Sequence, residues 1–173
     1  MGVRTIFNIM GPLTNPAGAR RQILGVYDPH LTEPLAQVLR ELGSERVFVV
    51  HGAGGLDELS TTGENRVSEL VNGEIKTYTL NPAELGLKPS SADAIRGGDP
   101  AENATITRNI LCGEGTPAQR EIVLLNAGAA LVAGGKVTDL SAGIMLAAEV
   151  IDSGSALGKL NDLVRHSQSV KVS

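Results

Sequence analysis

Two adjacent carboxylates, Asp57 and Glu58, follow an apolar run and a glycine-rich turn in the segment VFVVHGAGGLDELS (47–60). Adjacent residues diverge on a helix, so these two side chains can meet one ligand only from a turn. On a turn both could approach one hard cation, and Mg²⁺ suits such a pair because it keeps waters and takes further ligands from substrate phosphates. The turn glycines would let the main chain approach a charged ligand. Acids favoured by the dipole at a helix start fit the same residues, so the local pattern leaves both interpretations open.

Other candidate side chains carry weaker signals. His30, His51 and His166 have no metal-ligand spacing between them. His51 stands at the end of the apolar run, where a structural hydrogen bond is the favoured role, although contact with a ligand is possible there. Cys112 lies in an apolar helical pattern with no histidine nearby, which predicts a packing residue. None of these side chains therefore competes with the acidic pair.

Three arginines could meet phosphate groups, but solvated surface is the simpler interpretation for Arg20, Arg21 and Arg96. The sequence contains no G-x-S-x-G nucleophile elbow, so hydrolase chemistry has no support. The glycine-rich turn also does not fit the phosphate-binding patterns G-x-G-x-x-G and G-x-x-x-x-G-K-[ST].

The composition is that of a globular protein. The chain has 173 residues, 42% of them hydrophobic, which suits one domain or a large piece of a bigger one with an aliphatic core. A single cysteine suits a reducing compartment. A net charge of −4 without a lysine-arginine run argues against binding to a nucleic-acid backbone. Because the sequence has neither a long uncharged apolar segment nor the blocks of a secretory signal, we expect a cytoplasmic protein without a membrane partner.

The elements that must hold the acidic turn are a strand at 21–28, a helix at 31–44 and a strand at 46–52. Thr32 can cap the helix, and its predicted apolar face consists of Leu35, Val38, Leu39 and Leu42. The second strand is apolar throughout, as expected for a parallel strand covered on both faces. These segments predict a βαβ unit. Ligands bind beyond the carboxyl ends of strands in such sheets, which is where Asp57 and Glu58 fall.

The rest of the chain predicts a hairpin followed by helices. Two strands at 66–80 surround Asn72-Gly73, a strong two-residue turn signal. An ordered loop should follow at 81–100. Helices are expected at 101–112, 117–133, 139–152 and 155–166, and a frayed tail at 167–173. Small residues at 126–135 allow close helix packing. The expected fold class is α/β, with a mostly parallel sheet flanked by helices.

Five blocks of this sequence closely resemble the anthranilate phosphoribosyltransferase family of tryptophan biosynthesis. In chain order they are RTIFNIMGPLTNPA (4–17), GVYDP (25–29), VVHGAGGLDELS (49–60), GGDPAENA (97–104) and LLNAGAAL (124–131). The resemblance implies a pentosyltransferase that moves ribose 5-phosphate from phosphoribosyl pyrophosphate to the amine of anthranilate, with Mg²⁺ as cofactor. It also implies the large α/β domain of the nucleoside phosphorylase and phosphoribosyltransferase type, with the active site in a cleft beside a small helical domain.

The resemblance also assigns roles to four residues. It makes Asp57 and Glu58 the metal-binding pair, and it places Gly11 and Pro12 beside the anthranilate pocket. Through Mg²⁺ the two carboxylates would anchor the pyrophosphate group and neutralise the charge that develops as it leaves. The family match therefore favours the metal interpretation over the helix-start interpretation. No catalytic base is expected in this chain, because an aromatic amine needs little activation when the sugar carbon has oxocarbenium character.

This chain departs from the family in length. The family's Gly-Thr-Gly-Gly-Asp loop, its Lys-His-Gly-Asn block and an anthranilate-binding arginine precede the position that matches Met1. Residues 1–173 are therefore expected to be the carboxyl-terminal part of the α/β domain, with the amino-terminal helical domain and the first strands absent. We expect this part to be inactive alone and the full-length protein to be a homodimer.

Three other interpretations stay open at this point. Pyrimidine nucleoside phosphorylases share the fold expected here, but they use phosphate, and the Gly-Pro-Leu-Thr-Asn-Pro block is not theirs. A non-catalytic paralogue that binds nucleic acid should have a basic cleft and a disrupted acidic turn. The chain could also be a half-protein that pairs with a separate amino-terminal half.

Overall fold

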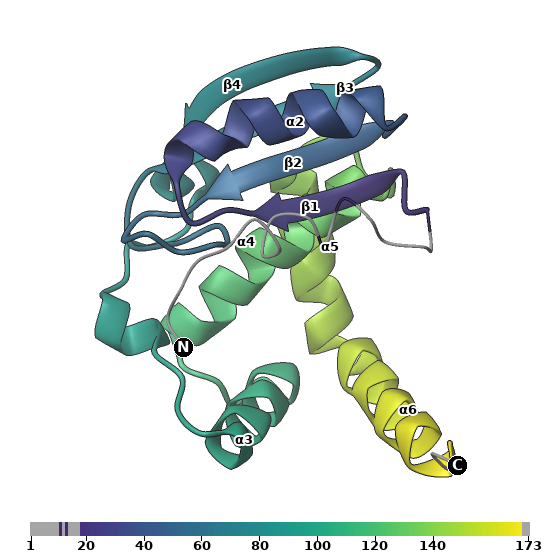
Figure 1. Ribbon diagram of the computed structural model, residues 1–173. Helices are drawn as coiled ribbons and strands as arrows, with labels where there is room; N and C mark the ends of the chain where they lie inside the picture. The colour runs from purple at the N-terminus through teal and green to yellow at the C-terminus, as the bar shows by residue number, and fades with distance from the viewer. Residues whose placement is uncertain (1–10, 12, 14–17, 171–173) are drawn as a thin grey trace.

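The structure is a computed structural model that describes Gly11, Leu13 and residues 18–170. Its described part contains a four-stranded sheet in the order β1-β2-β3-β4, with helices on both faces (Figure 1). The strands are β1 (Arg21–Gly25), β2 (Arg46–His51), β3 (Asn65–Val71) and β4 (Glu74–Leu80). The α/β class expected from the sequence is therefore confirmed.

The sheet is mixed, and the prediction of a mostly parallel sheet is wrong. Only β1 and β2 pair in parallel, across the helix of the predicted βαβ unit, whereas β2–β3 and β3–β4 are antiparallel. Between β2 and β3 the chain reverses through a loop without a crossover helix, and a parallel pair needs such a crossover. The next reversal is the predicted two-residue turn, in which Asn72 and Gly73 both have positive φ, at 52° and 83°.

Helix α2 (Thr32–Glu41) covers one face of the sheet, but its apolar face differs from the prediction. Leu35 and Leu39 are buried as expected, while Val38 and Leu42 are exposed. Thr32 does not cap the helix, because its hydroxyl donates to the Pro29 carbonyl at 2.9 Å, within the short 3-10 helix η1 (Pro29–Leu31). The sheet therefore selects a narrower stripe of α2 than the sequence periodicity indicated.

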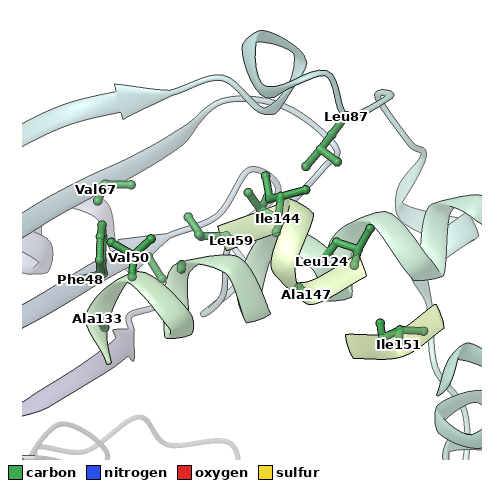
Figure 2. Close-up of a cluster of buried hydrophobic side chains, with 13 residues drawn as sticks. Phe48, Val50, Leu59, Val67, Leu87, Leu124, Ala133, Ile144, Ala147 and Ile151 are labelled. Atoms are coloured by element: carbon green, nitrogen blue, oxygen red, sulfur yellow. The ribbon is translucent and has the colours of Figure 1, made fainter. Parts of the chain in front are cut away.

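Strand β2 supplies both layers of the core. Val47 and Val49 pack on the side of α2, and Phe48 and Val50 pack on the side of α4 (Pro117–Ala133) and α5 (Leu140–Asp152). Figure 2 shows Phe48 and Val50 facing side chains from these two helices. Residues alternate between the two faces of a strand, so a continuous apolar run is what a strand covered on both sides requires.

Helices α4 and α5 approach each other closely through small residues, as predicted. A Cβ added to Gly128 would lie 2.9 Å from the Ile144 backbone nitrogen, and one added to Gly143 would lie 2.5 Å from the Gly128 carbonyl oxygen. Helix α4 begins where the sequence indicated, because Thr116 and Gln119 form a reciprocal capping box at its amino end. Helix α4 packs against both β1 and β2, and its carboxyl end reaches the start of β1, where Arg21 donates to the Gly134 carbonyl.

Two helices extend away from the sheet, α3 (Pro100–Leu111) and α6 (Ser155–Ser169) (Figure 1). Helix α6 continues into the segment predicted to be a frayed tail. Cys112, at the end of α3, is exposed, so the prediction that it is a packing residue is wrong. The loop before α3 is ordered as predicted and includes the short 3-10 helices η2 (Pro82–Leu85) and η3 (Ala92–Ile95).

Among the described residues no single helix is long and apolar enough to cross a membrane. Helices α5 and α6 together reach that length and apolar composition, but the chain bends by 68° between them.

Candidate functional site

The acidic turn lies directly beyond β2, at the carboxyl edge of its parallel pair with β1. Gly52 forms an isolated bridge with Leu56, and its carbonyl accepts from the Gly55 amide at 3.1 Å. Asp57 and Glu58 follow on a bend, and the next regular element is β3. No helix begins at the pair, so the helix-start interpretation is wrong. The two carboxylates are exposed on a turn, as the metal interpretation requires.

Two glycines at the strand ends make room for the main chain of the pair. A Cβ on Gly25, the last residue of β1, would overlap the Asp57 carbonyl. A Cβ on Gly52, just after β2, would overlap the Glu58 carbonyl. The acidic turn therefore sits against the ends of both parallel strands, at a distance that only glycine permits.

Helix α4 holds the residue that follows the pair. The Asn126 side chain accepts a hydrogen bond from the Leu59 amide at 3.0 Å and donates one to the Leu59 carbonyl at 2.7 Å. Its amide also donates to the Ile122 carbonyl, one turn earlier in α4, at 3.0 Å. Both polar groups of the Leu59 main chain are bonded to one side chain of α4. The helix therefore holds the main chain directly after the acidic pair in one position.

The next residue of the loop, Ser60, is also held by an asparagine side chain that bonds both of its main-chain polar groups. Asn65, the first residue of β3, accepts from the Ser60 amide at 2.7 Å and donates to the Ser60 carbonyl at 3.0 Å. Asn65 is fully buried. Two asparagines therefore clamp consecutive residues after Glu58, which leaves the acidic pair on a preorganised main chain.

The electrostatics of the pair favour a cation. Partial burial, followed by the nearby charge of Asp57, raises the pKa of Glu58 above its ordinary value. Two like charges on one turn repel each other, and a divalent ion between them removes that cost. No group of three or more His, Cys, Asp or Glu side chains suited to a metal exists among the residues that were placed. The donor set is thus two hard carboxylates, which fits Mg²⁺ completed by water and phosphate oxygens better than a closed protein cage.

A pocket of about 340 Å³ opens beside the pair. Glu58, Leu56 and Thr62 line it from the acidic loop, and Ile95 and Arg96 line it from the segment around η3. The two segments are joined, because the Thr61 and Ser90 hydroxyls lie 2.7 Å apart and the Ser90 amide donates to the Thr61 carbonyl at 3.1 Å. The sequence did not predict that the loop at 81–100 forms one wall of this pocket.

The remaining predicted residues lie as follows. His51 makes the structural hydrogen bond that was favoured, with Nδ1 donating to the Val26 carbonyl at 2.9 Å, and this bond ties the ends of β1 and β2 together. Gly11 is exposed, and an added Cβ there would meet none of the described residues within 4 Å. Pro12 lies outside the described residues, so the structure does not test its assignment.

The arginines and the other histidines lie on the surface. Arg20 and Arg21 both pair with Glu45 at 3.1 Å, at the opposite end of the strands from the acidic turn. His30 and His166 are exposed. Sequence reasoning missed the positioning residues Gly25 and Asn126, although both fall inside the family-like blocks at 25–29 and 124–131.

The α/β domain model of the glycosyl transferase family matches residues 1–157. The chain belongs to this family. It is 53% identical over 172 residues to the anthranilate phosphoribosyltransferase of Alkaliphilus metalliredigens, a match that covers 99% of this chain and 50% of that protein. The resemblance found in the five sequence blocks is therefore confirmed. The chain spans about half the length of the curated relatives it matches.

Solved structures agree with these matches. The anthranilate phosphoribosyltransferase of Thermus thermophilus superimposes with a TM-score of 0.86 at 47% identity, over 95% of this chain and 48% of that one. The enzyme from Saccharomyces cerevisiae in complex with PRPP and Mg superimposes with a TM-score of 0.83 at 32% identity, over 98% of this chain and 49% of that one. The yeast enzyme has also been solved with 4-fluoroanthranilate.

Proposed function

We propose that this chain is the metal-binding part of an anthranilate phosphoribosyltransferase, which transfers ribose 5-phosphate from phosphoribosyl pyrophosphate to anthranilate in tryptophan biosynthesis. The observation that carries the proposal is the placement of Asp57 and Glu58. They stand exposed beyond the parallel strands, on a main chain fixed by Gly25 and Asn126, and beside a pocket. The relatives' names and the yeast complex with PRPP and Mg support the choice of substrates.

In this proposal Asp57 and Glu58 hold Mg²⁺ and thereby anchor the pyrophosphate group. When bound, the ion supplies Lewis-acid stabilisation of the negative charge that grows on the leaving pyrophosphate. The protein's own contribution is orientation. The clamped Leu59 main chain keeps the carboxylates in place before the ligand arrives, so little reorganisation is needed as the glycosidic bond breaks.

The whole protein's architecture is also part of the proposal. Residues 1–173 form the carboxyl-terminal part of the large α/β domain, and the other part of the relatives' length supplies the remaining phosphate and anthranilate contacts. Gly11 and Pro12 line the anthranilate pocket. The complete protein is a homodimer.

The test uses this chain together with the remaining part of a relative, such as that from Alkaliphilus metalliredigens, and follows product fluorescence with both substrates and Mg²⁺. Asp57→Asn with Glu58→Gln should impair turnover at limiting Mg²⁺, with partial recovery at high Mg²⁺. Glu84→Gln with Glu114→Gln is a matched control, because both acids are exposed and lie away from the pocket. An unchanged Mg²⁺ dependence in the first double variant would remove the proposed role of the pair.

A further inference from the structure

Arg96 lines the same pocket as Glu58, on the wall formed by the segment around η3. The sequence favoured solvated surface for this arginine, and its side chain is indeed 74% exposed. Arg96 and the Glu58 carboxylate nevertheless line one pocket. A guanidinium and a metal-binding carboxylate in one pocket can bind opposite ends of a metal-bound anion.

The guanidinium of Arg96 has only a weak partner of its own. Across the described part of the chain its recorded ion pair is with Asp93, three residues earlier, at 3.0 Å, and the Asp93 side chain is 85% exposed. Exposed pairs of this kind contribute little, because water and salt screen them. The guanidinium can therefore exchange Asp93 for a stronger anionic ligand at small cost.

Arg96 and Glu58 line the same pocket from two different segments of the chain. Among the described residues, the ion pair of Arg96 is with Asp93, and none joins it to Glu58. A ligand in the pocket can therefore contact both charged groups.

The segment that carries Arg96 is anchored on both sides. Upstream, Ser90 is bonded to Thr61 of the acidic loop. Downstream, the Asn103 side chain accepts from the Gly98 amide at 2.9 Å and donates to the Gly98 carbonyl at 3.0 Å. A Cβ on Gly97 would collide with the same asparagine side chain. The backbone under Arg96 is thus held, while the long side chain is free to reorient.

We propose that Arg96 is a substrate-binding residue that contacts a phosphate oxygen of the metal-bound pyrophosphate group, opposite the Asp57–Glu58 metal pair. This inference rests on the proposed function. Arginine suits the role, because its planar fork binds phosphate oxygens in a bidentate manner. A phosphate ligand is favoured over the anthranilate carboxylate, since phosphate oxygens can complete the coordination of Mg²⁺, whereas a carboxylate beside Glu58 would be repelled.

The experiment uses the 173-residue chain complemented with the remaining part of a relative, and it measures binding of pyrophosphate in the presence of Mg²⁺ by isothermal titration calorimetry. Arg96→Ala should raise the Kd for Mg²⁺-pyrophosphate by about tenfold or more, the usual cost of one charge-assisted hydrogen bond. Arg96→Gln should weaken binding to a similar degree, and Arg96→Lys should weaken it less. Titration with Mg²⁺ alone should be unchanged in all three variants.

Arg165→Ala is a matched control, because Arg165 is 79% exposed and pairs with Asp162, three residues earlier, as Arg96 pairs with Asp93. It should bind Mg²⁺-pyrophosphate like the unaltered chain, and equal thermal midpoints would show that all variants fold.

If Arg96→Ala leaves the Kd unchanged while Asp57→Asn with Glu58→Gln abolishes binding, Arg96 has no such role and the proposed function stands. If Arg96→Ala weakens anthranilate binding instead, the inference is overturned in favour of a carboxylate contact. If the complemented protein with the unaltered chain does not bind Mg²⁺-pyrophosphate, both the inference and the proposed phosphate site fail.

Discussion

Gly25 and Asp57 are in such close contact that a Cβ on the glycine would overlap the aspartate carbonyl. Gly25 is the last residue of the edge strand β1, and Asp57 is the first residue of the acidic pair. The contact makes the position of the carboxylates depend on the backbone of β1, in addition to the strand that precedes them in sequence.

Gly25→Ala should displace the acidic turn. The added methyl group would meet main-chain atoms, which cannot rotate away, so we expect a loss of about 1–3 kcal/mol in the free energy of unfolding, typical of overpacking. When the remaining part of a relative is added to give a complemented enzyme, the Mg²⁺ concentration needed for half-maximal turnover should also rise. Gly158→Ala is the control, because an added Cβ there meets nothing within 4 Å. Normal Mg²⁺ dependence in Gly25→Ala would show that the close contact does not position the pair.

Asn126→Ala should destabilise the acidic loop. Leu59 is 1% exposed, so its amide and carbonyl would lose their partners in a buried environment. Each unsatisfied buried group costs about 1–3 kcal/mol. Urea denaturation measures the loss, and Asn161→Ala, which removes an exposed side chain on α6, should change stability much less. Equal effects of the two substitutions would contradict the clamp.

The stability of the fold should respond to pH through Glu58. Burial and Asp57 raise the folded-state pKa of Glu58 above its ordinary value of 4.5, so its neutral form is favoured in the folded chain. The contribution of this group is fully present below pH 4.5 and is lost as the pH rises through the raised pKa. Glu58→Gln should therefore have a higher Tm than the unaltered chain at pH 7, and the difference should vanish at acidic pH.

Mg²⁺ should reverse this ranking at pH 7, because the ion stabilises the ionised carboxylate and the glutamine cannot bind it equally well. Thermal melts with and without Mg²⁺ test the point. If Glu58→Gln and the unaltered chain gain equally from Mg²⁺, Glu58 is not a metal ligand.

Gly11→Val tests the proposed anthranilate pocket. Among the described residues, an added Cβ at this position meets nothing within 4 Å, so we expect the valine side chain to act on the substrate rather than on the fold. The KM for anthranilate should rise more than the KM for phosphoribosyl pyrophosphate in the complemented enzyme. Equal increases in the two constants would make Gly11 a backbone residue without a role in the pocket.

The 173-residue chain alone should not catalyse phosphoribosyl transfer at a useful rate. The family resemblance assigns the glycine-rich pyrophosphate loop and an anthranilate-binding arginine to sequence that this chain does not contain. Positioning and electrostatic stabilisation supply most of the acceleration in such reactions. Product fluorescence is compared for the chain alone and with the remaining part of a relative added. Appreciable turnover by the chain alone would mean that the phosphate site has been misplaced.

The sequence by itself determined the features that depend on neighbours along the chain. The apolar run of β2 and the Asn72-Gly73 turn each specify local structure through the side-chain pattern or the backbone preference of a few consecutive residues. The family-like blocks identified the acidic pair, and local glycines marked the turn on which it lies. These signals are readable because their causes lie within a few residues.

Tertiary structure decided what depends on contacts between distant segments. Contacts between distant segments decide that β3 pairs with β2 in an antiparallel manner. Such contacts also decide which stripe of α2 is buried. A periodic pattern within one segment does not contain this information. The same holds at the site, where Gly25 and Asn126 look like an ordinary strand end and an ordinary helix residue in the sequence. Their importance comes from main-chain atoms of Asp57 and Leu59, which only the folded chain brings within contact distance.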